Sequence, residues 1–319
     1  MLSINLNTAK PTINTFTDAA NTLVENFAKS RPIHANSLLV SIYGDTVCPH
    51  GDTIWLGSLI KLVAPLGINQ RLVRTSVFRL SEKNILVSKQ VGRRSYYALT
   101  DRAYRQFLSA SKRIYTANTQ PWDQQWRLVM TSLNKRSTEP CEALRKELYW
   151  LGFSRLTAGV YAHPMADVTE VQRIVKELKL EQHIAILTAS AADLTQVPVT
   201  NALIGDCFDL EKSEQDYQLL IDDFQGIYEA VQHEKSPDPM LCFLVRTLLI
   251  HRFRHILLKE PELPEALVLA QSASYRARGL VKQLYRLVSS NADKYFTRVS
   301  ETEGGNFQAP QDDYYRRFV

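Results

Sequence analysis

The sequence has 319 residues, of which 45% are hydrophobic and 22% are charged. Such a chain is long enough for two or three domains with a sizeable core, and its composition argues against a disordered, collagen-like or disulfide-stapled protein. No apolar run approaches the roughly 20 residues of a membrane-spanning helix, and the first 34 residues lack the apolar core of a signal peptide. The four cysteines are far apart and have no spacing that suits zinc, so we expect reduced thiols in a cytoplasmic protein.

Charge is unevenly distributed along the chain. Residues 31–118 have 13 Lys/Arg and 4 Asp/Glu, residues 119–240 have 11 and 19, and residues 241–319 have 12 and 8. A basic segment of this size is typical of a surface that binds a polyanion, most commonly nucleic acid. The alternative is a solvated charged face without a ligand.

The first third of the chain has the pattern of several helices followed by a hairpin. Helices are expected over 16–29, 35–43 and 56–64, with a short extended piece at 54–55 and a further helix that begins after Asn69 and ends near Lys83. The period then becomes that of strands over 85–90 and 96–99, joined by a glycine-containing turn, before a helix that begins at Thr100. Residues 35–118 are therefore predicted to be a winged helix-turn-helix domain that follows an N-terminal segment, 1–34.

The helix after Asn69 has one apolar and one basic face. At about 100° per residue, Val73, Val77 and Leu80 form a buried stripe. The opposite arc carries Arg71, Arg74, Thr75, Phe78 and Arg79. Arginines on such a helix bind phosphates or make bidentate bonds to guanine, so this arc is the predicted DNA-reading surface. For Phe78, packing against the hairpin is an alternative of equal weight.

The hairpin is basic at its tip, where Lys89, Arg93 and Arg94 stand. The wing of a winged helix-turn-helix meets DNA with this part of its surface, at the backbone or the minor groove, so these three residues are predicted DNA contacts. The alternative is a basic surface that binds protein.

The middle of the chain, 119–200, alternates strands and helices. Strands are expected over 126–133, 156–162 and 184–188, and helices over 139–151 and 168–180. This order predicts a small ferredoxin-like α+β domain. Domains of this kind more often dimerise or pack against other domains than catalyse reactions.

From residue 201 to 300 a helical domain for effector binding or dimerisation is expected, followed by a polar tail over 301–319. Its helices are predicted over 213–232, 238–260 and 272–297. The second helix is apolar nearly all round and should be buried, although it also carries Arg246, His251, Arg252, Arg254 and His255. Buried charges need partners, either acids such as Asp222, Asp223 and Glu229 or an anionic ligand. His251 and His255 are spaced as metal ligands can be, but no third ligand is apparent, and we expect no metal.

Several stretches of the chain share their residues with a known family. They are 41–45 (SIYGD), 54–59 (IWLGSL), 71–80 (RLVRTSVFRL), 92–97 (GRRSYY), Trp122 and Asp123 with Trp126, 251–254 (HRFR) and 261–264 (PELP). In these stretches the sequence resembles the PaaX family, the repressors of phenylacetate-degradation operons, over most of its length. The family often has Tyr at the position of Phe253 and Trp near Ser272, so this chain departs from the pattern there.

The resemblance implies a GntR-like winged-helix repressor with three domains, which binds double-stranded operator DNA as a homodimer and is released by phenylacetyl-CoA. An effector with several phosphates and an aromatic acyl end needs cations beside an apolar wall, and the helix over 238–260 offers both. His251, Arg252 and Arg254 are therefore the predicted effector contacts. We expect no catalytic residue and no cofactor besides this effector.

Two enzymatic hypotheses were weighed against the repressor. The middle domain also resembles the small metal-dependent nucleases of CRISPR adaptation, but these need a carboxylate at the end of the first strand, where this chain has 132–136 (SLNKR). An acyl-CoA enzyme is the other hypothesis, although no glycine-rich phosphate loop, nucleophile elbow or Cys/His pair is apparent.

Overall fold

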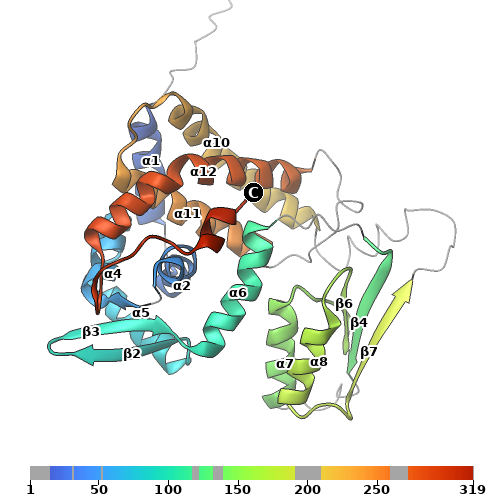
Figure 1. Cartoon of the computed structure of the whole chain (residues 1–319). Coiled ribbons are helices and arrows are strands. Elements are labelled where there is room, and N and C mark those ends of the chain that lie inside the picture. The colour runs from blue at the N-terminus through green and yellow to red at the C-terminus, as the bar shows by residue number, and fades with distance from the viewer. Residues whose placement is uncertain are drawn as a thin grey trace, which may run out of the picture.

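The computed structural model describes residues 15–30, 32–51, 53–116, 122–131, 139–190, 210–258 and 272–318. A winged helix-turn-helix packs against the long C-terminal helices, and a smaller α+β domain is attached through a connecting helix (Figure 1). The α+β class and the three kinds of domain predicted from the sequence are confirmed. Two of the sequence stretches singled out above, 132–136 and 261–264, lie outside the described residues.

The N-terminal helix α1 (Phe16–Lys29) belongs to the C-terminal helices rather than to the helix-turn-helix. Thr15 and Asp18 form a capping box that begins it. Its buried residues Phe16, Ala20 and Val24 recur every four positions. This face packs against α10 and α11, so the first ordered segment joins the helical domain at the other end of the chain (Figure 1).

The helix-turn-helix follows the predicted order. Its elements are α2 (Ala35–Ile42), a π-helical turn η1 (Tyr43–Val47), α3 (Cys48–His50), β1 (Ile54–Trp55), α4 (Leu56–Val63), the 3₁₀ turn η2 (Ala64–Leu66) and α5 (Gln70–Glu82). Gly67, at a φ of +73°, ends η2 in the left-handed region that favours glycine. The Asn69 side chain then accepts the Leu72 N–H at 2.9 Å and caps α5.

The wing is a three-stranded antiparallel sheet in the order β1-β3-β2. It consists of β2 (Leu86–Val91) and β3 (Arg94–Leu99) with β1 at one edge. The turn is shorter than predicted, because Val91 pairs with Arg94 and only Gly92 and Arg93 lie between the strands. Gly92 has a φ of +59°, which such a two-residue turn demands. Thr100 caps the connecting helix α6 (Asp101–Tyr115).

The central domain is a four-stranded antiparallel sheet with α7 and α8 on one face (Figure 1). Its elements are β4 (Gln125–Thr131), α7 (Glu139–Trp150), β5 (Ser154–Thr157), β6 (Val160–His163), α8 (Val168–Glu177) and β7 (Ile184–Ser190), in the sheet order β5-β6-β4-β7. Two strands replace the single one predicted over 156–162, because Gly159, at a φ of +80°, reverses the chain there. The domain has its own core, which includes Val129, Leu148 and Val171.

The C-terminal helices are α10 (Leu210–His233), α11 (Pro239–Leu257) and α12 (Ala273–Val299). α11 is buried on nearly every side, as its composition predicts, and shares one core with the helix-turn-helix. Among the described residues, no helix is long and apolar enough to cross a bilayer.

The segment expected to be a polar tail is ordered and partly buried. It forms the hairpin β8 (Glu301–Thr302) and β9 (Gly305–Asn306) and a 3₁₀ turn η4 (Asp312–Arg316). Phe307, Tyr314 and Phe318 are buried. Phe307 packs against Phe296 and His50, and Phe318 against Tyr115 and Tyr285, so apolar contacts of widely spaced aromatic residues hold a segment whose average composition is polar.

Candidate nucleic-acid interface

Helix α5 presents the predicted residues to solvent. Arg71, Arg74, Thr75, Phe78 and Arg79 are all exposed. Val73, Val77 and Leu80 are buried in the core below them. The Phe78 side chain is 62% exposed, which excludes its packing against the wing and leaves its ring on the outer arc.

The end of α5 and the start of the wing are joined by short hydrogen bonds. Asn84, at a φ of +54°, turns the chain, and the Ile85 N–H donates to the Leu80 carbonyl at 2.9 Å. The Thr100 hydroxyl donates to the Asn84 carbonyl at 2.8 Å and ties the other end of the hairpin to the same turn. The helix and the hairpin therefore form one rigid unit with two basic surfaces.

The cations of the wing have different surroundings. Arg93 is exposed in the turn. Arg94 stacks over the Trp55 ring at 4.5 Å from its centroid and forms an ion pair with Glu301. Lys89 forms an ion pair with Glu303 at 2.7 Å. Two of the three predicted wing contacts thus have acidic partners from the C-terminal hairpin, which the sequence analysis did not anticipate.

The residues predicted to bind an effector on α11 make internal contacts. His251 Nδ1 is 3.0 Å from Ser41 Oγ, Arg254 donates to the carbonyl of Ser37 at 3.1 Å, and Arg252 pairs with Asp223 at 2.8 Å. Burial lowers the pKa of His251 to about 3, so the ring is neutral at pH 7. These contacts fasten α11 to α2 and α10, and a role of the three residues in ligand binding stays a prediction.

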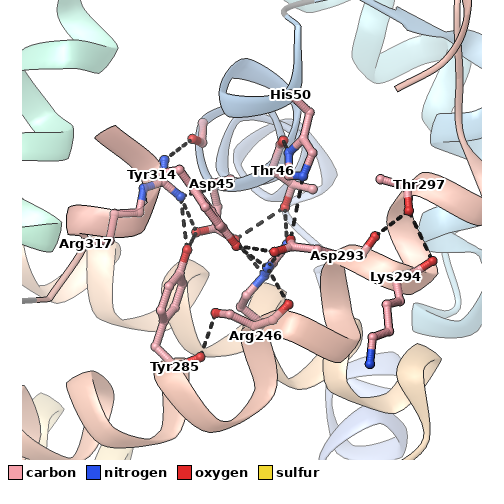
Figure 2. A network of polar contacts seen from close by, with 12 residues as sticks. Asp45, Thr46, His50, Arg246, Tyr285, Asp293, Lys294, Thr297, Tyr314 and Arg317 are labelled. Atoms are coloured by element: carbon pink, nitrogen blue, oxygen red, sulfur yellow. Dashed lines mark hydrogen bonds and ion pairs between the residues drawn. The ribbon is translucent and has the colours of Figure 1, made fainter. Parts of the chain in front are cut away.

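Arg246 is fully buried, and its partners come from distant segments (Figure 2). Its guanidinium pairs with Asp45 at 3.1 Å and with Asp293 at 2.6 Å, and donates to the Tyr314 hydroxyl at 2.8 Å. Of the acids that the sequence suggested as partners for α11, Asp223 does pair, but with Arg252. An acid in the apolar stretch 41–45 was the signal that pointed to Asp45.

Asp45 collects donors from three further elements. Tyr115 of α6 and Tyr285 of α12 donate to its carboxylate at 2.7 and 3.0 Å, and Arg317 lies 3.3 Å from the same oxygen (Figure 2). Arg317 also donates to the Asp45 carbonyl at 2.7 Å. This network connects the π-helical turn of the helix-turn-helix with α6, α12 and the C-terminal segment. A buried network of charges holds only if each member keeps its partners.

Comparison with known proteins adds to this geometry. Three family models match the chain: "PaaX-like protein" over residues 34–103, "PaaX protein central Cas2-like domain" over 119–199 and "PaaX-like protein C-terminal domain" over 208–298. The transcriptional repressor PaaX of Escherichia coli (strain K12) is 31% identical over 298 residues, which are 93% of this chain and 94% of that protein.

A solved structure shares the fold. The uncharacterized protein Rv0674 from Mycobacterium tuberculosis superposes with a TM-score of 0.50 at 20% sequence identity, over 83% of this chain and 98% of that one.

Proposed function

This chain belongs to the PaaX family of transcriptional repressors, and from that premise we propose that it represses a phenylacetate catabolic operon in the cytoplasm. In this proposal it binds operator DNA as a dimer and leaves the DNA when phenylacetyl-CoA binds. It is a regulator of the repressor type rather than an enzyme.

One observation carries the DNA-binding part of the proposal. The outer arc of α5 presents three arginines and an aromatic ring to solvent, directly beside a basic hairpin to which the helix is hydrogen-bonded. An α-helix of this kind fits the major groove, where arginine reads guanine and apolar groups contact the thymine methyl. Arg93 at the tip of the hairpin then reaches the phosphate backbone, which positions the protein without reading sequence.

A dimer is proposed because the symmetry of an operator with two half-sites mirrors a protein two-fold axis. What supports it is the outer face of the central sheet, opposite α7 and α8. Met130 and Leu187 on this face are 41% and 45% exposed, and burying such side chains between two copies is favourable. The double variant Met130→Arg/Leu187→Arg should then sediment as a monomer, and an unchanged mass in ultracentrifugation would place the dimer contact elsewhere.

The proposed function is tested by fluorescence anisotropy with a duplex from the upstream region of the protein's own operon. We expect an affinity at least about a thousandfold above that for random duplex, falling steeply with salt, and no cleavage of either DNA. Addition of phenylacetyl-CoA should release the duplex, whereas phenylacetate and free CoA should not. Equal affinity for both duplexes would refute the repressor proposal, and cleavage would favour the nuclease.

A further inference from the structure

A cavity of about 1030 Å³ lies between α6, the central domain and the C-terminal segment. Its volume is at the upper end of the range for small-molecule sites, about 300 to 1,000 Å³. The three segments that line it belong to different parts of the chain, and none of the residues on α11 predicted to bind an effector lines it.

The α6 wall is a single helical stripe. Arg105, Leu108, Ser109, Lys112 and Thr116 line the cavity and are spaced three, four, seven and eleven residues from the first, so they share one face of the helix. Leu108 is 44% exposed although it is apolar, and Arg105 and Lys112 extend into solvent on either side of it. The wall thus combines two cations with an apolar patch.

The facing wall comes from the central domain and is nearly balanced in charge. Arg173 of α8 forms ion pairs with Glu170, at 2.6 Å, and with Glu177, and all three line the cavity. Burial, together with the nearby Arg113, lowers the pKa of His163 to about 3 and leaves that ring neutral. Met165 adds apolar surface. The excess positive charge of the cavity therefore lies on α6 and on the C-terminal segment.

The C-terminal wall connects the cavity with the helix-turn-helix. Tyr314 and Arg317 line the cavity, and both belong to the network around Asp45 and Arg246 (Figure 2). Because the Arg317 guanidinium lies 3.3 Å from the Asp45 carboxylate, an anion that binds Arg317 competes with a side chain of the DNA-binding domain. A ligand here has direct contact with an element that differs between a rigid and a loosened helix-turn-helix.

We propose that this cavity binds an organic anion that has phosphate groups at one end and an apolar group at the other, with the phosphates on Arg105, Lys112 and Arg317 and the apolar group against Leu108. This inference rests on the proposed function in one respect, since it makes a CoA thioester the ligand to be tried first. A ligand that releases DNA must bind the DNA-free conformation more tightly, and operator DNA must weaken its binding by the same factor.

The test is calorimetric titration of phenylacetyl-CoA into the full chain and four variants. Arg105→Ala/Lys112→Ala removes two cations of the cavity, and Ser109→Trp fills it. Lys176→Ala/Lys212→Ala removes two exposed cations outside the lining and is the matched control. Arg252→Ala removes the exposed α11 cation that the sequence analysis favoured. All variants are first checked for an unchanged melting temperature and for operator affinity without ligand.

The expected result is a loss of about tenfold or more in ligand affinity for Arg105→Ala/Lys112→Ala, and no detectable binding to Ser109→Trp. Lys176→Ala/Lys212→Ala and Arg252→Ala should bind as the wild type does. Free CoA should bind more weakly than the thioester, because it leaves the apolar wall without a partner.

Wild-type affinity in both cavity variants would overturn the proposal, as would equal affinity for free CoA and the thioester. No binding of phenylacetyl-CoA to the wild type would overturn it too. Operator binding is measured separately, so specific retention of the duplex would leave the repressor proposal standing in each of these cases.

Discussion

Glu301, the first residue after the long helix α12, forms an ion pair with Arg94 of the wing. The Glu301 N–H donates to Ser58 Oγ at 3.0 Å, which holds the C-terminal hairpin against α4, and the neighbouring Glu303 pairs with Lys89 at 2.7 Å. Two carboxylates therefore occupy positions where a DNA phosphate would meet the wing. The effector domain and the DNA-binding domain are in contact here as well as in the buried network.

The first prediction is that Glu301→Gln/Glu303→Gln binds DNA more tightly. Phosphates then meet the cations of the wing without displacing carboxylates, and since exposed pairs contribute about 0.2 to 1 kcal/mol each, affinity should rise about two- to tenfold. Anisotropy with operator and random duplex at several salt concentrations measures the change. Glu181→Gln/Glu211→Gln, which removes two exposed acids outside the hairpin, should have no such effect. An unaltered affinity in both would show that the hairpin leaves the wing before DNA binds.

The second prediction concerns reading of the bases by α5. Arg74→Ala and Arg79→Ala should each lower operator affinity by about 1 to 3 kcal/mol and relax the preference at one base pair, because each loses a bidentate contact. Both side chains are exposed, so the melting temperature should not change. Binding to a set of single-base operator variants is the measurement. Wild-type affinity and base preference in both proteins would contradict the assignment of the recognition helix.

The third prediction concerns the tip of the wing. Arg93→Ala should weaken binding to operator and to random duplex by the same factor, and the slope of log K against log salt should become shallower by about 0.9. Arg94→Ala should act in the same direction but less strongly, because its removal also leaves Glu301 without a cation. A slope equal to that of the wild type for Arg93→Ala would place the hairpin off the DNA.

The fourth prediction is a loss of stability in acid that depends on two histidines. Burial lowers the pKa of both His163 and His251 to about 3, below the value of about 6.5 in the unfolded chain. The unfolded state therefore binds more protons below pH 6.5, and the free energy of unfolding falls as the pH falls, by on the order of 2 kcal/mol per histidine at pH 5. Urea unfolding between about pH 7 and pH 5 should show a smaller decrease for His163→Gln/His251→Gln than for the wild type. Parallel curves for the two proteins would mean that neither ring is held neutral.

The sequence by itself determined the elements of the DNA-binding domain and the exposed face of α5. Helix caps such as Asn69, the period of Val73, Val77 and Leu80, and the change of period at the wing are local, and backbone geometry follows from a few neighbouring residues. The same local pattern predicted that α11 would be buried. Where a turn depended on one residue, as at Gly159, the local pattern was too weak, and two strands were predicted as one.

Only the tertiary structure decided which charges meet. Arg246 and Asp45 are separated by 200 positions, as are the wing cations and the C-terminal glutamates, and nothing in the spacing of charges identifies such partners. The cavity is likewise assembled from α6, the central domain and the C-terminal segment. Periodicity specifies which face of an element is apolar, but the partner of that face depends on how the whole chain packs, because burial is non-directional and many pairings satisfy the same pattern.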